Sequence, residues 1–398
     1  MYRQILVDSI EARYQKIVHR DHPRAVINTY ALNTLTYGKA CASHLAVRSL
    51  YQLAQDESHL HPLAVAVLTR DFHVGDGLTG ANTHEEASCL RDQLEELLRK
   101  GGFNLRKWAS NEPSLIVNCA EHPTSTHMSL DLEASIKTLE ILWNAREDTL
   151  FYSVNIVEQG SHTKRRILSQ IAKLYDPLSL LGPVIVYAKS IIQLCWKSGV
   201  TWVESVPQNI HDMWIAYQKQ LPLLEKLHFP RCLISPNVVN IQMHGFCDAS
   251  EKAYGACIYL RTTNCEGIVR ITLICSKSRV APVNTVSLPR LELCAAALLA
   301  NLYSTVRESL LIPVNEFHLW SDSTITLHWL QTAPHRLKTF VANRVAEVQR
   351  KTLCCRWRHL FSQDNPADYI SRGQLPREFI QIVLWSQGPS WLPLESSA

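Results

Sequence analysis

Hydrophobic and polar positions in the last 160 residues follow two different periods. Strands are predicted over 240–247, 253–261, 269–276, 316–320 and 354–360, where apolar residues alternate with polar ones or form short runs. Helices are predicted over 288–302, 324–330 and 337–351, where the apolar spacing is helical. Three strands, a helix, a strand, two helices and a strand are typical of an α/β fold with a mixed sheet.

The preceding part of the chain is more helical. Helical spacing predicts helices over 40–55, 83–100, 167–174 and 183–195 and a helical pair within 202–227. Gly101 and Gly102 end the second of these helices, as glycine commonly does at a helix C-terminus. Residues 149–157 alternate as a strand would, and 230–236 is expected to be a linker.

The composition describes a globular chain. It has 398 residues, 46% hydrophobic and 19% charged, which predicts two or three domains and excludes a disordered chain. The formal net charge of +4 permits a polyanionic partner without requiring one. None of the 12 cysteines forms a C-x-x-C pair, so no zinc is expected, and the simplest expectation is that they are reduced and buried.

Targeting and membrane segments are not expected. Residues 1–4 (MYRQ) open no apolar signal-peptide core, and the most apolar stretches, 178–188 and 294–302, are too short to span a bilayer. We therefore expect a soluble intracellular protein, cytoplasmic or nuclear, with no membrane partner.

Four carboxylates stand out in the last third of the chain. Asp248 follows an apolar strand, Asp322 ends one, and Asp368 opens the final segment. Glu292 lies inside the most apolar helix, where burial of an ionised and unpartnered carboxylate would cost several kcal/mol. Any one of these acids taken alone is more often a cap, a turn residue or a surface acid.

Together, the four acids could bind metal. Mg²⁺ prefers carboxylate oxygens, and four carboxylates can bind two ions ~3.5–4 Å apart. Such a pair of ions polarises the attacking water and the leaving oxygen of a phosphodiester.

The residues around these acids resemble a known family. The segments FCDAS (246–250), SLPRLEL (287–293), WSDS (320–323) and DNPAD (364–368), with 44, 30 and 46 residues between successive acids, are similar to the ribonuclease H domain of Pao/BEL-type LTR retrotransposon polyproteins. Upstream, KWASN (107–111) and YDPLSLLGP (175–183) resemble the thumb and connection segments of the reverse transcriptase of that family. The resemblance covers nearly the whole chain.

This resemblance implies a domain organisation. It predicts a truncated reverse-transcriptase palm and thumb over 1–155 and a helical connection over 156–235. A ribonuclease H-like domain follows over 236–375, with a five-stranded mixed sheet and flanking helices, and 376–398 would be a C-terminal tail.

The resemblance also implies an activity. Asp248, Glu292, Asp322 and Asp368 would bind two Mg²⁺ ions, with Mn²⁺ as a substitute, and the domain would hydrolyse the RNA strand of RNA–DNA hybrids. Asp248 would contact both ions, Glu292 and Asp322 mainly the first, and Asp368 the second. Related enzymes place a histidine before the last aspartate. The nearest here, His359, ends a strand, and we assign it no catalytic role.

The polymerase site of the family is degenerate here. The segment FHVGDG (72–77) matches its aromatic-x-Asp-Asp turn, but Gly75 replaces the first aspartate and only Asp76 remains. The third aspartate would precede residues 1–6 (MYRQIL), Ser43 replaces a typical proline in YGKACAS (37–43), and we expect the fingers to be missing. Because one carboxylate cannot bind two divalent ions, we expect no DNA synthesis.

A basic stretch follows the predicted nuclease acids. It predicts contacts with the phosphate backbone, although a solvated helix face would look the same. Its residues are Arg336, Lys338, Arg344, Arg350, Lys351, Arg356 and Arg358. The expected partner is an RNA–DNA hybrid or another duplex, possible further partners being other retrotransposon proteins.

Two other functional classes make different demands on the sequence. An aspartic peptidase would need an Asp-Thr/Ser-Gly turn, which this sequence lacks. The main alternative is a non-catalytic relic or a domesticated nucleic-acid-binding protein, which the degenerate polymerase turn favours. The four intact acids favour the nuclease.

Overall fold

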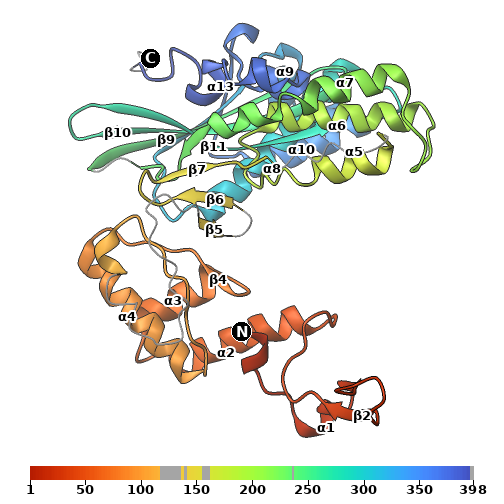
Figure 1. Cartoon of the computed structure of the whole chain (residues 1–398). Coiled ribbons are helices and arrows are strands. Elements are labelled where there is room, and N and C mark those ends of the chain that lie inside the picture. The colour runs from red at the N-terminus through yellow and green to blue at the C-terminus, as the bar shows by residue number, and fades with distance from the viewer. Residues whose placement is uncertain (117–135, 139–140, 155–161, 235–236, 395–398) are drawn as a thin grey trace. The chain divides into compact units, whose positions relative to one another are not determined.

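The structure is a computed structural model of the 398-residue chain, and it describes residues 1–116, 136–138, 141–154, 162–234 and 237–394 (Figure 1). The chain divides into two compact units. The N-terminal unit comprises Met1–Leu139 and Ala145–Glu147, and the C-terminal unit comprises Glu140–Asn144 and Asp148–Ala398.

The N-terminal unit is built around three helices with a small shared core. They are α2 (Ala42–Asp56), α3 (Pro62–Arg70) and α4 (His84–Lys100). Thr83 caps α4 by accepting a hydrogen bond from the Glu86 amide at 3.2 Å, so the expected helix begins where the sequence predicts it. The remaining elements are η1 (Tyr2–Gln4), α1 (Ser9–Ala12), β1 (Lys16–His19), β2 (Asn28–Ala31), β3 (Phe72–His73), β4 (Asp76–Gly77) and η2 (Pro113–Leu115).

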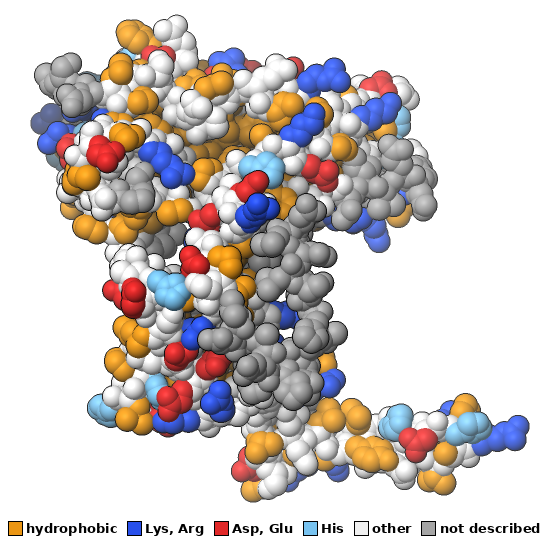
Figure 2. Space-filling view, turned by 60° about the vertical axis from the view of Figure 1, so that its left-hand side comes forward, with side chains coloured by type: hydrophobic (Ala, Val, Ile, Leu, Met, Phe, Trp, Pro, Cys, Tyr) orange, Lys and Arg blue, Asp and Glu red, His pale blue; other side chains and the backbone are white. Residues whose placement is uncertain are grey.

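Many apolar side chains of the N-terminal unit are exposed. Among the described residues, strands β1 and β2 pair only with each other, and every residue in them is exposed. Tyr30 in β2 is one example, and Val26 and Ile27 just before it are exposed as well. Figure 2 shows hydrophobic side chains lying at the surface beside charged ones. A paired hairpin without a covering layer buries little apolar area, so these strands gain little from the hydrophobic effect.

The C-terminal unit contains a five-stranded mixed sheet in the order β11-β10-β9-β12-β13. Strand β10 pairs antiparallel with both β9 and β11, whereas β12 runs parallel to β9 and β13 parallel to β12. The strands are β9 (Val238–Ala249), β10 (Ala253–Asn264), β11 (Val269–Val280), β12 (Glu316–Ser321) and β13 (Arg356–His359). The predicted α/β class with a ribonuclease H-like five-stranded mixed sheet is confirmed.

Helices cover both faces of this sheet (Figure 1). Successive strand residues point to opposite faces, so Phe246 joins one hydrophobic core and its neighbour Cys247 joins the other. The Cys247 face packs against α8 (Leu288–Ser309), α9 (Thr324–Gln331) and α10 (Thr339–Lys351). The Phe246 face packs against α5 (Lys164–Ile171), α6 (Gly182–Lys197), α7 (Gln208–Gln218) and α11 (Ala367–Arg372).

The C-terminal segment completes the core on the Phe246 face. It contains α12 (Pro376–Phe379) and α13 (Val383–Gln387). The buried Trp385 indole donates to the Leu180 carbonyl at 2.8 Å, and the Tyr259 hydroxyl donates to the Trp385 carbonyl at 2.7 Å. Segments predicted as connection and tail therefore share one core with the sheet. The division into these four segments stays a prediction.

Strands β6, β7 and β8 of the C-terminal unit belong to a small sheet in the order β5-β6-β7-β8. Its strands are β5 (Ile136–Thr138), β6 (Ile141–Asn144), β7 (Thr149–Phe151) and β8 (His228–Pro230). The strand expected over 149–157 is thus shorter, and its residues 155–157 lie outside the described residues. The predicted linker at 230–236 overlaps β8. The predicted helical pair consists of α7 and one 3₁₀ helix, η4 (Leu221–Lys226), which has a proline in its first turn.

Two expectations about the chain as a whole can be compared with the structure. None of the helices in the described ranges is long and apolar enough to cross a bilayer.

The expectation that the cysteines are buried is wrong for nearly half of those described. Buried thiols belong to Cys195, Cys247, Cys257 and Cys275, whereas exposed thiols belong to Cys41, Cys89, Cys232, Cys265 and Cys354.

Candidate metal-dependent nuclease site

Two parallel strands bring the first and third predicted acids together. In the register of β9 and β12, Cys247 lies opposite Ser321, so Asp248 and Asp322 follow at the same edge of the sheet. Two buried residues at this point, Cys247 and Ser321, hold the strand ends in the core. The carboxyl ends of neighbouring parallel strands therefore present both aspartates on one side.

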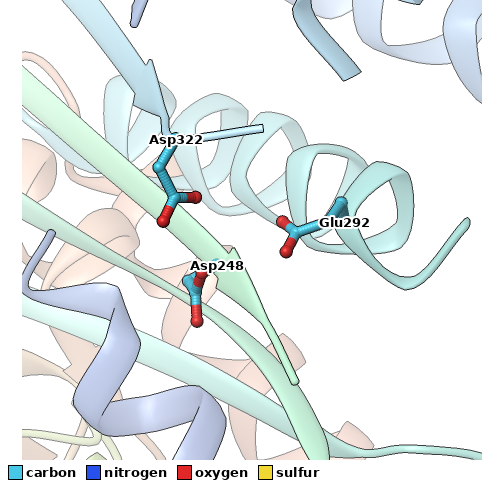
Figure 3. A group of neighbouring side chains, drawn as sticks. All are labelled: Asp248, Glu292 and Asp322. Atoms are coloured by element: carbon cyan, nitrogen blue, oxygen red, sulfur yellow. The ribbon is translucent and has the colours of Figure 1, made fainter. Parts of the chain in front are cut away.

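Helix α8 supplies the third carboxylate. Its second turn packs against the sheet and places Glu292 facing the strand ends, and Figure 3 shows the three carboxylates pointing toward one another. One ligand oxygen from each of Asp248, Glu292 and Asp322 lies within 4.8 Å of the other two. Asp248 and Glu292 are buried, and Asp322 is half-buried. The structure thus brings together three of the four predicted acids.

The fourth predicted acid lies outside this group of three. Asp368 is at the start of α11, and its Oδ1 accepts a hydrogen bond from the Arg372 Nε at 2.6 Å. Its charge still raises the pKa values of Asp248 and Glu292, which places it in the electrostatic neighbourhood of the site. Asp368 is therefore near the three-acid group but paired with a cation.

Burial makes the negative charges of the site costly. Desolvation, with the charges of Asp322 and Asp368, raises the pKa of Asp248 to about 7, although hydrogen bonding to Ser371 opposes the change. Desolvation, with the charges of Asp248 and Asp322, raises the pKa of Glu292 to about 9. Both carboxyl groups thus favour the protonated form unless a positive charge compensates them.

The donor set fits divalent cations. Among the described residues, the buried Oε2 of Glu292 has no hydrogen-bond partner, and a bound cation would satisfy it. Three carboxylates offer the hard oxygen ligands that Mg²⁺ and Mn²⁺ prefer, with no thiol or imidazole among them. Asp248, Glu292 and Asp322 are therefore the residues that could bind an ion as the structure stands.

Asn365 is a supporting residue that the sequence analysis missed. It is fully buried, donates to the Cys247 carbonyl at 3.1 Å and accepts from the Ala367 amide at 3.1 Å. These bonds attach the segment before Asp368 to the strand that carries Asp248. An asparagine before a proline at a helix start is a recognisable turn signal, but its long-range partner on β9 is not visible in the sequence. Ser362 similarly donates to Asp322 Oδ2 at 2.7 Å.

The seven predicted basic residues do not form one stripe. Arg344 and Lys351 lie on α10 and line a groove of about 680 Å³ beside α8, where Lys351 is paired with Glu347. Arg358 lies over the Trp320 ring and Arg356 near Glu316, on the opposite face of the sheet from α10. Strand alternation separates Arg356 and Arg358 from the basic residues of α10. Trp357, which lies between the two arginines in β13, packs toward α10, so both arginines point to the opposite face.

The other basic residues lie before or along α10. Arg336 ends η5 (Pro334–Arg336), Lys338 directly precedes α10, and Arg350 lies in its last turn. The predicted role of all seven in nucleic-acid binding stays a prediction.

The segment that the family resemblance matches to a polymerase turn, residues 72–77, is a short hairpin. Phe72 pairs with Gly77 and His73 with Asp76, so Gly75 and Asp76 lie at the tip, where both are exposed. Within the described ranges, Asp76 belongs to no group of three or more potential metal ligands. His359, at the end of β13, is exposed and lies opposite Ser321 in the sheet.

Comparisons with known proteins agree with the family expected from the motifs. Residues 163–323 match the family model described as the Pao retrotransposon-like RNaseH-like domain, a range that includes Asp248, Glu292 and Asp322. No curated protein sequence matches the chain.

Solved structures with a likeness to the chain include two of the foamy viral protease-reverse transcriptase. One, in complex with an RNA/DNA hybrid, is 10% identical with a TM-score of 0.45, and the match covers 91% of this chain and 43% of that chain. The other, in complex with double-stranded DNA, is 11% identical with a TM-score of 0.43 and coverages of 84% and 51%. This chain thus spans about half the length of these viral proteins.

A third solved structure is that of LC11-RNase H1 in complex with an RNA/DNA hybrid. It is 12% identical with a TM-score of 0.25, and the match covers 35% of this chain and 99% of that chain. The family assignment itself depends on the sequence match over residues 163–323. The motif-based expectation of the family is confirmed over these residues, which match the model of the Pao retrotransposon-like RNaseH-like domain.

Proposed function

We propose that this chain is a retrotransposon-derived nuclease that hydrolyses the RNA strand of RNA–DNA hybrids with divalent cations. The observation that carries the proposal is the convergence of Asp248, Glu292 and Asp322 at one edge of the sheet, with a buried carboxylate oxygen of Glu292 that has no hydrogen-bond partner among the described residues. A structural role would favour neutral or paired groups at such a position. A site for a cation explains why three buried or half-buried acids lie together.

Each residue has a proposed part in this reaction. Bound Mg²⁺ would supply the activation of water and the stabilisation of the leaving oxygen. Asp248, Glu292 and Asp322 would bind the ions, and Asp368 would join them once its carboxylate leaves Arg372. Asn365 would position the segment that carries Asp368, since it bonds the Cys247 carbonyl beside Asp248.

Cleavage of a labelled hybrid by the full chain tests the proposal. We expect Mg²⁺-dependent cutting of the RNA strand only, with no cutting in EDTA. Asp322→Asn should lower the rate by at least about a hundredfold, because loss of outer-shell partners alone costs 10–100-fold. Asp212→Asn is the matched control, since Asp212 is an exposed acid on α7. If Asp322→Asn cuts as fast as the wild type, the assignment of Asp322 to the nuclease site is wrong.

The polymerase half is proposed to be inactive. Its support is the exposed hairpin with Asp76 as the remaining acid of the motif. A primer-extension assay on the full chain with Mg²⁺ or Mn²⁺ should give no templated product. Extension that depends on Asp76 would contradict this part of the proposal without affecting the nuclease part.

The alternative is a nucleic-acid-binding relic. Its support is the pairing of Asp368 with Arg372, which leaves three of the four family acids grouped. This alternative predicts binding of the hybrid without cleavage in any divalent ion. The cleavage assay therefore separates the two functions, whereas a binding assay would not.

A further inference from the structure

Two exposed tryptophans and a buried lysine form a cluster that the proposed nuclease reaction does not use. Trp196 lies at the end of α6 and is 55% exposed, and Trp202 lies in the following loop and is 39% exposed. Their rings meet edge to face with centroids 5.5 Å apart. Large aromatic side chains exposed as a pair are uncommon on a surface without a binding role.

Lys164 positions both rings. Its side chain is buried, and its ammonium lies 3.2 Å from the Trp196 ring centroid and 5.0 Å from that of Trp202. The same ammonium donates to the Val200 carbonyl at 3.5 Å, so the loop is attached to the first turn of α5. Two cation–π contacts and this bond fix the rings and restrict their rotamers, which lowers the entropy cost of binding a flat ligand.

Two further cations border the tryptophans. Arg165 is exposed on α5, and its backbone amide donates to the Trp202 carbonyl at 3.3 Å. Lys197 is exposed and adjoins Trp196 in the chain. Within the described ranges, neither side chain forms an ion pair with an acid, and the nearby Glu204 carboxylate accepts from the Thr201 amide at 2.8 Å. The cluster therefore combines rigid aromatic surface with positive charge.

We propose that Trp196 and Trp202 form a stacking platform for single-stranded nucleic acid, with Arg165 and Lys197 binding its phosphates. Bases stack on aromatic side chains with little regard to sequence, and cations beside the rings attract the backbone. Because the rings are at 87° to each other, two bases would bind in different orientations, which suits an unpaired strand rather than a duplex.

The platform belongs to the C-terminal unit but lies apart from the carboxylate site. Helices α5 and α6 cover the Phe246 face of the sheet, whereas Glu292 is on α8, which covers the other face. Binding at the platform requires no hydrolysis and does not depend on the proposed nuclease function. Failure of one proposal leaves the other intact.

Fluorescence anisotropy of the full chain with labelled dT₁₂ and U₁₂ in EDTA tests the platform, and the two probes distinguish DNA from RNA as its ligand. Trp202→Ala should weaken binding about tenfold, since one stacked base contributes ~1–3 kcal/mol. Trp202→Phe should restore part of the affinity. The double variant Arg165→Glu/Lys197→Glu should weaken binding and flatten its salt dependence.

Matched controls use residues of the same unit. Tyr175→Ala removes another exposed aromatic, and Lys219→Glu/Lys226→Glu reverses two exposed charges at and after α7. Both should bind within about twofold of the wild type, and circular dichroism should show that every variant is folded. The proposal is overturned if the wild type binds neither probe, if the tryptophan variants bind like the wild type, or if the controls lose as much affinity.

Photo-crosslinking of the wild-type chain covers the case in which a tryptophan variant does not fold. A 5-iodouracil-substituted T₁₂ probe crosslinks to aromatic rings on which its bases stack. We expect adducts on the peptides that contain Trp196 and Trp202. Adducts found only elsewhere would overturn the platform.

Discussion

The two units of the chain bury their apolar side chains to very different extents. In the C-terminal unit, two hydrophobic cores fill both faces of a five-stranded sheet whose three longest strands have 12 residues each. In the N-terminal unit, the cores are small, and large apolar side chains such as Leu6, Val26 and Leu60 are exposed. The same chain thus contains one unit with large hydrophobic cores and one unit with small cores and exposed apolar side chains.

This difference in burial parallels a difference between the two predicted active sites. The C-terminal unit groups three acids on rigid strand and helix ends, while the N-terminal unit presents Asp76 on an exposed hairpin. Strongly perturbed carboxylates need a surrounding core that can hold them against their own repulsion. A small hydrophobic core cannot hold such carboxylates in place. The comparison therefore predicts that substitutions in the core of the C-terminal unit have large effects, whereas substitutions at exposed sites of the N-terminal unit have small ones.

Trp385→Ala should give the largest effect on stability. Trp385 is 1% exposed, and its removal leaves a cavity and an unpaired Leu180 carbonyl, at a cost of about 3–5 kcal/mol. Urea unfolding followed by tryptophan fluorescence measures it, because nine of the ten tryptophans lie in the C-terminal unit.

Leu97→Ala, in the core of the N-terminal unit, is the control for that experiment. It should leave the tryptophan-detected transition unchanged. If it lowers that transition as much as Trp385→Ala does, the two units unfold together and the comparison fails.

Acid should destabilise the C-terminal unit through His244. Burial, helped by nearby His318, Arg261 and Arg358, lowers the pKa of His244 from 6.5 to about 3. Between these values the unfolded chain binds a proton that the folded chain excludes, so stability is full above pH 6.5 and falls as the pH falls. The loss is about 1.4 kcal/mol per pH unit, or about 3 kcal/mol by pH 4.

Carboxyl groups also titrate in this range, so the slope must be compared between variants. His244→Gln should flatten the dependence of the free energy of unfolding on pH, whereas the exposed His335→Gln should not. Equal slopes in the wild type and His244→Gln would show that the buried histidine is not the cause.

Glu292→Gln should stabilise the metal-free C-terminal unit while it abolishes cleavage. At pH 7.5 the unfolded chain releases the Glu292 proton, whereas the folded chain, with a pKa of about 9 at this group, retains it. Stability from this group is therefore lost as pH rises above its unfolded value. A neutral amide removes that loss, and we expect a gain of about 1–3 kcal/mol in EDTA.

Thermal unfolding with and without Mg²⁺ checks this prediction. Mg²⁺ should raise the midpoint of the wild type more than that of Glu292→Gln, because the ion binds only the folded site. Glu308→Gln, at the exposed end of α8, is the control and should change neither value. A loss of stability in EDTA would argue against the strained carboxylate.

Tyr30→Ser should have the smallest effect. Tyr30 lies in the exposed strand β2, and substitutions at such sites usually change the free energy of unfolding by less than about 0.5 kcal/mol. Hydrogen exchange should also show β1 and β2 exchanging faster than β9 and β10. Strong protection of β1 would mean that this hairpin is covered in solution, which would remove the contrast between the units.

Local patterns determined much of the fold of the C-terminal unit. Alternation along 240–261 and helical spacing along 288–302 predict β9, β10 and α8 to within a few residues, except that α8 extends further to Ser309. These elements bury one side of a regular period, so the sequence carries their signal directly. The Gly-Gly stop after Lys100 similarly marks the end of α4.

Local sequence patterns did not predict the long-range packing. The sequence suggested a connection and a tail, yet Trp385 bonds Leu180 and Tyr259 within one core. The basic stretch looked continuous, but strand alternation sends Arg358 to the face opposite α10. Such outcomes depend on which elements become neighbours, and residues far apart in sequence leave no local period.

The candidate site combines both kinds of information. The sequence by itself determined the four acids, their family resemblance and the position of Glu292 inside an apolar helix. Only the tertiary structure decided that Asp248, Glu292 and Asp322 converge, while Asp368 pairs with Arg372. The reason is physical: strand and helix periods fix which way a side chain points from its own element. The distance between two carboxylates depends on how the elements pack.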